Sequence, residues 1–526
     1  MKRLKTLISL SLLLTAASAD ARPFARGPVA KIDAGQLSGF NEDGVDAFLG
    51  IPYAAPPVGE NRWRAPQPVT PWKSLRSARE FGPSCPQNIM SSLGPYTQEY
   101  LPSGATSEDC LTVHVWKPEG AAKNLPVLVW IHGGGFTSGS ASVPIYDGAA
   151  LARQGIVVVA INYRVGFLGS LAAPEFRGNG GGNFGLQDQI EALRWVKRNI
   201  AGFGGDPGQV TISGQSAGSF AVHQLIMAPS AKGLFHRANP ISGASMGTGY
   251  DLWLDTREGA EKSAAQLFAA AGVTSVAEAR KLPIEVLRAA YTKAGGIPGS
   301  ALGFRNKPYA DGELLPLDPV AAFKEGKFND TPVLIGLARD EGAGPATEEP
   351  ADAARYQEAL RKRYGVLAPE LLKLYPYQAG APLLRTINLD ARIGATTAWS
   401  SEHARFSRFP LYAYVWTHVR PTAEAAKYGA FHTSEVPYIF GTLDKSEAST
   451  FTDADVAVAK TMQGYWLNFV KTGNPNGADL PQWPLFEPDH KLIELGGKFG
   501  TFRSVDPAVE KLFVTYIRDG HSLFGM

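Results

Sequence analysis

A serine between two glycines is the first group in this chain whose setting suggests chemistry. Ser216 stands in the stretch S-G-Q-S-A-G-S, residues 213–219. Glycine in an ordered element costs about 0.5 to 1 kcal/mol relative to alanine, so the pair indicates a need for special backbone geometry or close approach. A plain loop is one interpretation. The other is a nucleophile on a strained turn, with its hydroxyl exposed to attack an acyl carbon.

A second glycine cluster could stabilise the charge that such an attack creates. A tetrahedral oxyanion needs preorganised hydrogen-bond donors, and the run H-G-G-G-F at 132–136 can turn several backbone N–H groups toward one point. Gly134 and Gly135 are the predicted donors, together with Ala217, which directly follows the serine. A plain turn or a phosphate-binding loop is the alternative, but the G-K-[ST] of a phosphate loop does not follow.

The flanking segments predict the elements that hold these residues. Continuous apolar runs predict buried strands at residues 125–131 and 156–162, and the stretch Q-V-T-I-S predicts a third strand at 209–213. Apolar residues spaced by three and four predict a helix from residue 186 to 200, and residues 216–227 lack proline and can form another. Ser216 therefore lies in a strand-turn-helix setting, which favours the nucleophile. The order of elements predicts an α/β fold with a mainly parallel central sheet flanked by helices.

The rest of the chain is expected to belong to the same body, a single domain of residues 20–526. Apolar runs predict two further strands, at residues 332–337 and 411–416. Alanine-rich stretches predict helical insertions at about 250–327 and 350–408. The prolines between residues 52 and 57 are expected to exclude a central strand there.

The first residues have the pattern of a secretory signal. Three basic residues precede an apolar run over 7–14, and small residues follow, so cleavage is expected after Ala19 or Ala21. The run is shorter than the roughly 20 residues that span a bilayer, which makes an uncleaved anchor the weaker interpretation. We expect a secreted or periplasmic protein without a membrane anchor. Removal of residues 1–19 changes the net charge from +2 to −1 and leaves no basic field for nucleic acid.

Other site chemistries find little support. Hydrophobic residues make up 44% and charged residues 19%, as in ordinary globular proteins. The two cysteines, Cys85 and Cys110, predict a disulfide in an oxidising compartment, with two free thiols as the alternative. No H-E-x-x-H or paired C-x-x-C motif indicates a metal, and no cofactor is expected. A G-x-G-x-x-G at residues 180–185 lacks the preceding strand that a dinucleotide site requires.

Several longer stretches together resemble type B carboxylesterases, the cholinesterase-like branch of the α/β-hydrolases. They are F-L-G-I-P-Y-A-A-P-P-V-G at 48–59, S-E-D-C-L-T-V at 107–113, W-I-H-G-G-G-F at 130–136, G-N-F-G-L-Q-D-Q at 182–189 and G-Q-S-A-G-S at 214–219. The resemblance implies an α/β-hydrolase fold and a serine hydrolase that cleaves small-molecule carboxylic esters through an acyl-enzyme. A catalytically inactive binding protein on the same fold is the alternative.

The resemblance also implies a Ser-Glu-His triad, with the glutamate in a D-E-G turn after a strand and the histidine late in the chain. Glu341 and His432 match these positions, and the order Ser216, Glu341, His432 is that of α/β-hydrolases. Most α/β-hydrolases use aspartate, which favours Asp340; the resemblance to this branch favours Glu341. His432 would take the serine proton, and Glu341 would fix the tautomer of the imidazole.

Two positions depart from cholinesterases. Gln215 is neutral where they carry glutamate, and Tyr100 stands where their choline-stacking tryptophan would fall. Esters with uncharged alkyl or aryl groups are therefore expected in preference to choline esters. Tyr96 and Tyr100 lie within the loop that the family's first disulfide closes, where they either face substrate or pack in the core. Ser242 resembles the family's second serine near the triad. The natural substrate and the oligomeric state stay open.

Overall fold

The computed structural model describes residues 27–120, 122–178, 181–243, 254–295, 307–341, 349–446, 449–502, 505–521 and 523. The signal expected at residues 1–19 lies outside these ranges, as do Gly180 of the G-x-G-x-x-G pattern and Gly342 of the D-E-G turn.

An 11-stranded sheet runs through the molecule in the order β14-β13-β12-β11-β10-β9-β7-β8-β6-β4-β3. Its strands are β3 Phe40–Glu42, β4 Val45–Pro52, β6 Thr112–Pro118, β7 Leu125–Ile131, β8 Val157–Ile161, β9 Gly205–Gln215, β10 Arg237–Ile241, β11 Val333–Ala338, β12 Leu411–Trp416, β13 Leu492–Leu495 and β14 Gly500–Thr501. All neighbours from β8 to β13 are parallel, and the pairs toward both edges are antiparallel. A second, separate sheet has three strands, β1 Val29–Ile32, β2 Gly35–Ser38 and β5 Arg76–Ser77. The predicted mainly parallel sheet is confirmed.

Helices cover both faces of this sheet. They are α1 Ala149–Ala152, α2 Gly166–Gly169, α3 Phe184–Asn199, α4 Ala217–Met227, α6 Arg257–Ala271, α7 Val276–Arg280, α8 Ile284–Lys293, α9 Pro319–Lys324, α10 Ala353–Tyr364, α11 Ala368–Leu374, α12 Leu383–Phe406, α13 Ala425–Tyr428, α14 Val436–Phe440, α15 Asp453–Thr472 and α16 Pro507–Arg518. Among these described helices, none is both long enough and apolar enough to cross a membrane.

The central strands of the sheet supply two separate cores, because successive side chains point to opposite faces. In β7, Val127 and Val129 join the apolar core of α3, α4 and α12. Their neighbours Leu128 and Trp130 join the core of α1, α14 and α15. The continuous apolar sequence of β7 thus reflects burial on both faces.

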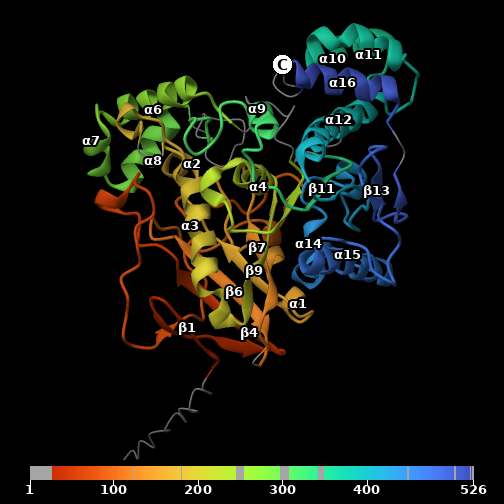
Figure 1. Cartoon of the computed structure of the whole chain (residues 1–526). Coiled ribbons are helices and arrows are strands. Elements are labelled where there is room, and N and C mark those ends of the chain that lie inside the picture. The colour runs from red at the N-terminus through yellow and green to blue at the C-terminus, as the bar shows by residue number, and fades with distance from the viewer. Residues whose placement is uncertain are drawn as a thin grey trace, which may run out of the picture.

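The helical insertions gather on one side of the sheet. Figure 1 shows the group α6–α8 and the group α10–α12 on the same upper side of the molecule, with α4 between them. The first group has its own apolar cluster, which includes Leu267 and Leu287 from the helices and Trp63 and Phe167 from elsewhere in the chain. The second group packs through α12 into the core of the sheet.

The expectation that the prolines exclude a central strand holds for residues 53–57, which form neither strand nor helix, whereas Pro52 itself ends a strand that has neighbours on both sides. Strand β4 runs as far as Pro52 and pairs with β3 on one side and β6 on the other. The register shifts between Phe48 and Ile51. The strand tolerates Pro52 because the missing N–H falls at its last residue rather than in its interior.

The predicted disulfide is confirmed. Cys85 and Cys110 are bonded, with their Cα atoms 5.1 Å apart. The bond closes the loop that carries Tyr96 and Tyr100 and fixes both ends of that loop to the same point of the fold.

Candidate active site

Ser216 has a strained backbone at the junction of β9 and α4. Its φ of 59° and ψ of −121° form a combination that L-residues rarely adopt. The glycines on either side permit close packing: a Cβ at Gly214 would lie 2.4 Å from the carbonyl oxygen of Gly218, and one at Gly218 would lie 2.0 Å from that of Ile131. The glycine pair therefore serves the turn that presents the serine, and the plain-loop interpretation fails.

Glu341 and His432 are joined by a hydrogen bond between the carboxylate Oε2 and Nδ1 of the imidazole. The Glu341 side chain is 4% exposed, whereas that of His432 is 19% exposed. Burial raises the pKa of Glu341, but the charge and hydrogen bond of His432, with Arg392, outweigh burial and lower it to about 2. Burial lowers the pKa of His432, and Glu341 more than offsets this, so the net shift is upward. Glu341 is therefore ionised at neutral pH, and the neutral imidazole keeps its proton on Nδ1.

Asp340, the other candidate acid, has different partners. Its Oδ2 accepts a hydrogen bond from the backbone N–H of Ala430 at 2.8 Å, and its Oδ1 accepts one from Arg385 at 2.5 Å. Its backbone N–H also donates to the carbonyl of Ala430 at 3.0 Å. Asp340 thus fastens the segment that leads into His432, whereas Glu341 contacts the imidazole itself.

The glycine loop after β7 lies against the serine. A Cβ at Gly133 would lie only 3.0 Å from the Cβ of Ser216. Gly134 and Gly135 have φ values of 106° and 63°, which favour glycine. Among the described residues, none accepts a hydrogen bond from the N–H of Gly134 or Gly135. Ala217 is the first residue of α4, so its N–H is one of the donors that a helix leaves unpaired.

Comparison with known proteins decides the family to which this site belongs. A family model described as "Carboxylesterase family" matches residues 26–500. The chain belongs to the carboxylesterase family. Among curated relatives, the para-nitrobenzyl esterase of Bacillus subtilis (strain 168) is 36% identical over 471 residues, 86% of this chain and 92% of that protein. The fumonisin B1 esterase of Sphingopyxis macrogoltabida is 34% identical over 494 residues, 89% of this chain and 86% of that protein.

A solved structure of a thermophilic PNB esterase is also similar to this carboxylesterase. It superposes with a TM-score of 0.76 at 33% identity and covers 92% of this chain and 99% of that chain. The resemblance found in the sequence motifs is confirmed, as are the α/β-hydrolase fold and the hydrolysis of carboxylic esters. The inactive binding protein is not favoured.

A buried glutamate that the sequence analysis missed lies near the histidine of this carboxylesterase. Glu435 accepts a hydrogen bond from the Oγ of Ser242 at 2.8 Å. Burial, with the nearby negative charge of Glu341, raises the pKa of Glu435 to about 7. The sequence singled out Ser242 but not its partner. Its position three residues after His432 was the signal that could have found it.

Tyr100 belongs to an aromatic cluster that surrounds a buried cation. The guanidinium carbon of Arg420 lies 4.9 Å from the ring centre of Tyr100, 5.8 Å from that of Phe431 and 5.9 Å from that of Phe451. Arg420 also donates to the carboxylate of Glu99 at 3.0 Å and is only 2% exposed. Tyr100 is 6% exposed and belongs to the apolar core that includes Trp130 and Phe431.

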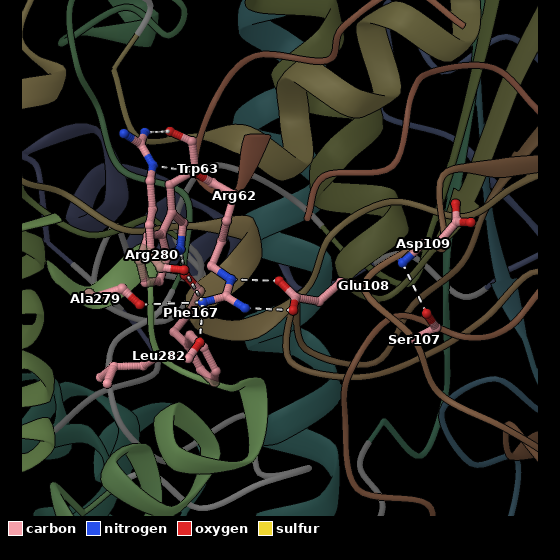
Figure 2. A network of polar contacts seen from close by, with 9 residues as sticks. All are labelled: Arg62, Trp63, Ser107, Glu108, Asp109, Phe167, Ala279, Arg280 and Leu282. Atoms are coloured by element: carbon pink, nitrogen blue, oxygen red, sulfur yellow. Dashed lines mark hydrogen bonds and ion pairs between the residues drawn. The ribbon is translucent and has the colours of Figure 1, made fainter. Parts of the chain in front are cut away.

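An arginine clamp holds the helical group α6–α8 of the carboxylesterase to the disulfide loop. Figure 2 shows the Arg62 guanidinium between the carboxylate of Glu108 and the turn that joins α7 and α8. Its bonds to the two Glu108 oxygens are 2.6 and 2.7 Å long, and a third nitrogen donates to the carbonyl of Leu282 at 2.8 Å. In the same network Trp63 donates to the carbonyl of Phe167 at 2.8 Å.

The clamp supports one wall of a cavity of about 230 Å³ beside the glycine loop. Its lining includes Arg288 and Tyr291 of α8, Phe167 of α2, Gln87 of the disulfide loop and Thr137, which directly follows the glycine loop. Neither Ser216 nor His432 lines this cavity. It adjoins the site without enclosing the reacting groups.

The G-x-G-x-x-G pattern has a packing explanation. A Cβ at Gly182 would lie 1.7 Å from the carbonyl oxygen of Leu171, and one at Gly185 would lie 2.6 Å from that of Arg164. A 3-10 helix at Pro174–Phe176 precedes the pattern instead of a strand. Within the described ranges there is also no group of three or more His, Cys, Asp or Glu side chains placed to hold a metal ion.

Proposed function

We propose that this carboxylesterase cleaves esters with uncharged alcohol groups through an acyl-enzyme on Ser216, with His432 as the base and Glu341 as its carboxylate partner. The hydrogen bond between Glu341 and His432 carries the proposal, because it leaves a lone pair on Nε2 of a partly exposed imidazole. The strained turn at Ser216 supports the role of the nucleophile.

The mechanism follows from these groups. As the Ser216 oxygen attacks the acyl carbon, its proton moves to Nε2 of His432, and the Glu341 carboxylate stabilises the imidazolium. The N–H groups of Gly134, Gly135 and Ala217 stabilise the oxyanion. The imidazolium then gives its proton to the leaving alkoxide, and the alcohol departs. Water repeats the sequence at the acyl-enzyme, which releases the acid and restores the serine.

Covalent labelling tests the nucleophile. A dialkyl p-nitrophenyl phosphate should abolish ester hydrolysis at one label per chain, because a phosphorylated serine mimics the tetrahedral intermediate. Mass spectrometry of the peptides should place the label on Ser216 and on no other serine, including Ser219 one turn further along α4. Stoichiometric label elsewhere, or full activity after complete labelling of Ser216, would refute the proposed mechanism.

The preference for an uncharged alcohol group rests on the aromatic cluster. A quaternary ammonium group binds to aromatic faces that have no cation of their own. Here Tyr100 and Phe431 already surround the guanidinium of Arg420, and Gln215 supplies no negative charge beside the serine. A choline group would therefore gain neither a free aromatic face nor an ion pair.

Two esters of the same shape test this preference. 3,3-Dimethylbutyl butyrate has a carbon in place of the choline nitrogen of butyrylcholine, so only the charge differs. We expect kcat/KM for the choline ester to be lower by about tenfold or more, since the desolvation of its cation is not repaid. Equal values, or a higher value for butyrylcholine, would contradict the assignment.

We also propose that the carboxylesterase is exported to the periplasm or beyond as a single domain of residues 20–526. The basic, apolar and small-residue segments at residues 1–19 support export, and the bonded Cys85 and Cys110 suit an oxidising compartment. A mature N-terminus at Asp20 or Arg22 is the expected result of sequencing the secreted protein, and an intact Met1 would refute cleavage.

A further inference from the structure

We propose that Gln215 is a positioning residue, whose side-chain amide holds His432 as the neutral base in the free enzyme by donating a hydrogen bond to Nε2. This inference rests on the proposed roles of Ser216 and His432. Gln215 is the last residue of β9, directly before the serine, and is 2% exposed. Its amide nitrogen Nε2 lies 3.0 Å from Nε2 of His432.

The direction of this hydrogen bond follows from the other side of the ring. Nδ1 of His432 is bonded to the carboxylate of Glu341, which can only accept when it is ionised. The proton of the neutral imidazole is therefore on Nδ1, and Nε2 presents a lone pair. Of the two polar groups of the Gln215 amide, only the NH₂ group can donate to that lone pair, because the carbonyl oxygen is an acceptor. The proton of Ser216 must move to the same lone pair during catalysis, so the amide and the serine share one acceptor.

Close packing holds the amide in this place. A Cβ at Gly133 would lie 2.8 Å from the backbone oxygen of Gln215 and 3.2 Å from its side-chain Oε1. The backbone of Gln215 also pairs with Ile241 in β10. The side chain thus lies between the glycine loop and His432, with contacts on both sides.

The amide favours the neutral histidine, because its NH₂ group donates to a lone pair that only the neutral ring presents. After His432 has taken the serine proton, Nε2 carries a hydrogen and cannot accept. A glutamate in its place could only accept and would favour the imidazolium throughout, whereas a methionine would pair with neither form.

The other charged groups around the imidazole stay the same in such variants. Glu341 follows β11, Glu435 lies at the start of α14, and Arg392 lies on α12; these are the charges that act on His432. A substitution at position 215 therefore tests the effect of the amide alone on the pKa of His432. Because kcat/KM rises as the base loses its proton, a higher pKa of His432 moves the rising limb of the profile to higher pH.

The test is the pH profile of kcat/KM for the wild type, Gln215→Met and Gln215→Glu, with Gln224→Met as the matched control. Gln224 is buried on α4 and loses an amide in the same way. We expect the pKa of the base to rise by about half a unit to one unit in Gln215→Met and by about one to two units in Gln215→Glu. Gln224→Met should keep the wild-type profile. An unchanged or lowered pKa in Gln215→Met would overturn the inference.

A second measurement does not depend on activity. In Ser216→Ala, the low-field proton NMR signal of the Nδ1 hydrogen of His432 should report its pKa directly. Adding Gln215→Met to that variant should raise this pKa, and an unchanged value would overturn the inference. The two proposals fail separately: high activity in Ser216→Ala refutes the nucleophile, whereas the NMR titration concerns the amide alone.

Discussion

Ser216→Ala is expected to lower kcat/KM for a neutral ester by about 10⁴-fold or more. The methyl group cannot attack the acyl carbon, and water would have to replace the serine oxygen without its fixed position. The donors of Gly134 and Gly135 remain, so activity above the uncatalysed rate is expected to persist. Steady-state kinetics with p-nitrophenyl butyrate measure the loss.

The control for this variant is Ser219→Ala. Ser219 is buried on the same helix and donates a hydrogen bond to the carbonyl of Gly243 at 2.7 Å. The substitution removes the hydrogen bond of the Ser219 hydroxyl but no group that takes part in the reaction. Activity should therefore stay within about tenfold of the wild type. The backbone bond from the Ser216 N–H to Ile241 is present in both variants, and both should fold. Near-normal activity of Ser216→Ala would refute the nucleophile.

Glu341→Gln is expected to lower kcat by about 10² to 10⁴-fold, with a smaller change in KM. Glutamine keeps the shape of the side chain but not the charge that stabilises the imidazolium. It can also donate to Nδ1 of His432, which would put the imidazole proton on Nε2 and leave no acceptor for the serine. Kinetics at saturating substrate separate this loss from a loss of binding.

Asp340→Asn is the matched control, since it removes the neighbouring charge. Asp340 forms ion pairs with Arg339 at 2.9 Å and Arg385 at 2.5 Å, and its side chain is 3% exposed. The variant should therefore lower the melting temperature, because two guanidinium groups lose their partner. Its kcat should fall less than that of Glu341→Gln. A larger loss of kcat in folded Asp340→Asn would show that the acid is assigned wrongly.

Strands with uniform apolar sequences were predictable, whereas β6 and β10, which contain buried polar residues, were not predicted. The runs at 125–131 and 411–416 match β7 and β12 residue for residue. By contrast, β6 contains His114, whose Nδ1 accepts from the backbone of Gly50, and β10 contains Asn239, which donates to the carbonyl of Leu334. These partners lie far away in sequence, so no local pattern shows that the polar groups are satisfied.

The candidate site likewise contains residues that the sequence predicts and residues that it does not. The Ser216 turn and the glycine loop carry local signatures, because strained backbone requires glycine at fixed spacing. The choice between Asp340 and Glu341 has no local signature, since it depends on which carboxylate reaches His432 across 91 residues. Arg420 could not be predicted either, because its aromatic neighbours come from separate segments of the chain.

The hydrogen bonds of the site also bear on how the protein reaches its active form. His432 is bonded to residues that lie 91 and 217 positions before it in the chain. Contacts of such long sequence separation form slowly, because the intervening chain must be ordered first. No local folding unit contains the site, so esterase activity should return on refolding only when the central sheet is complete. Recovery of esterase activity thus reports the last step of folding. A fragment that ends before residue 432 contains the turn that carries Ser216 but lacks the histidine that would take its proton.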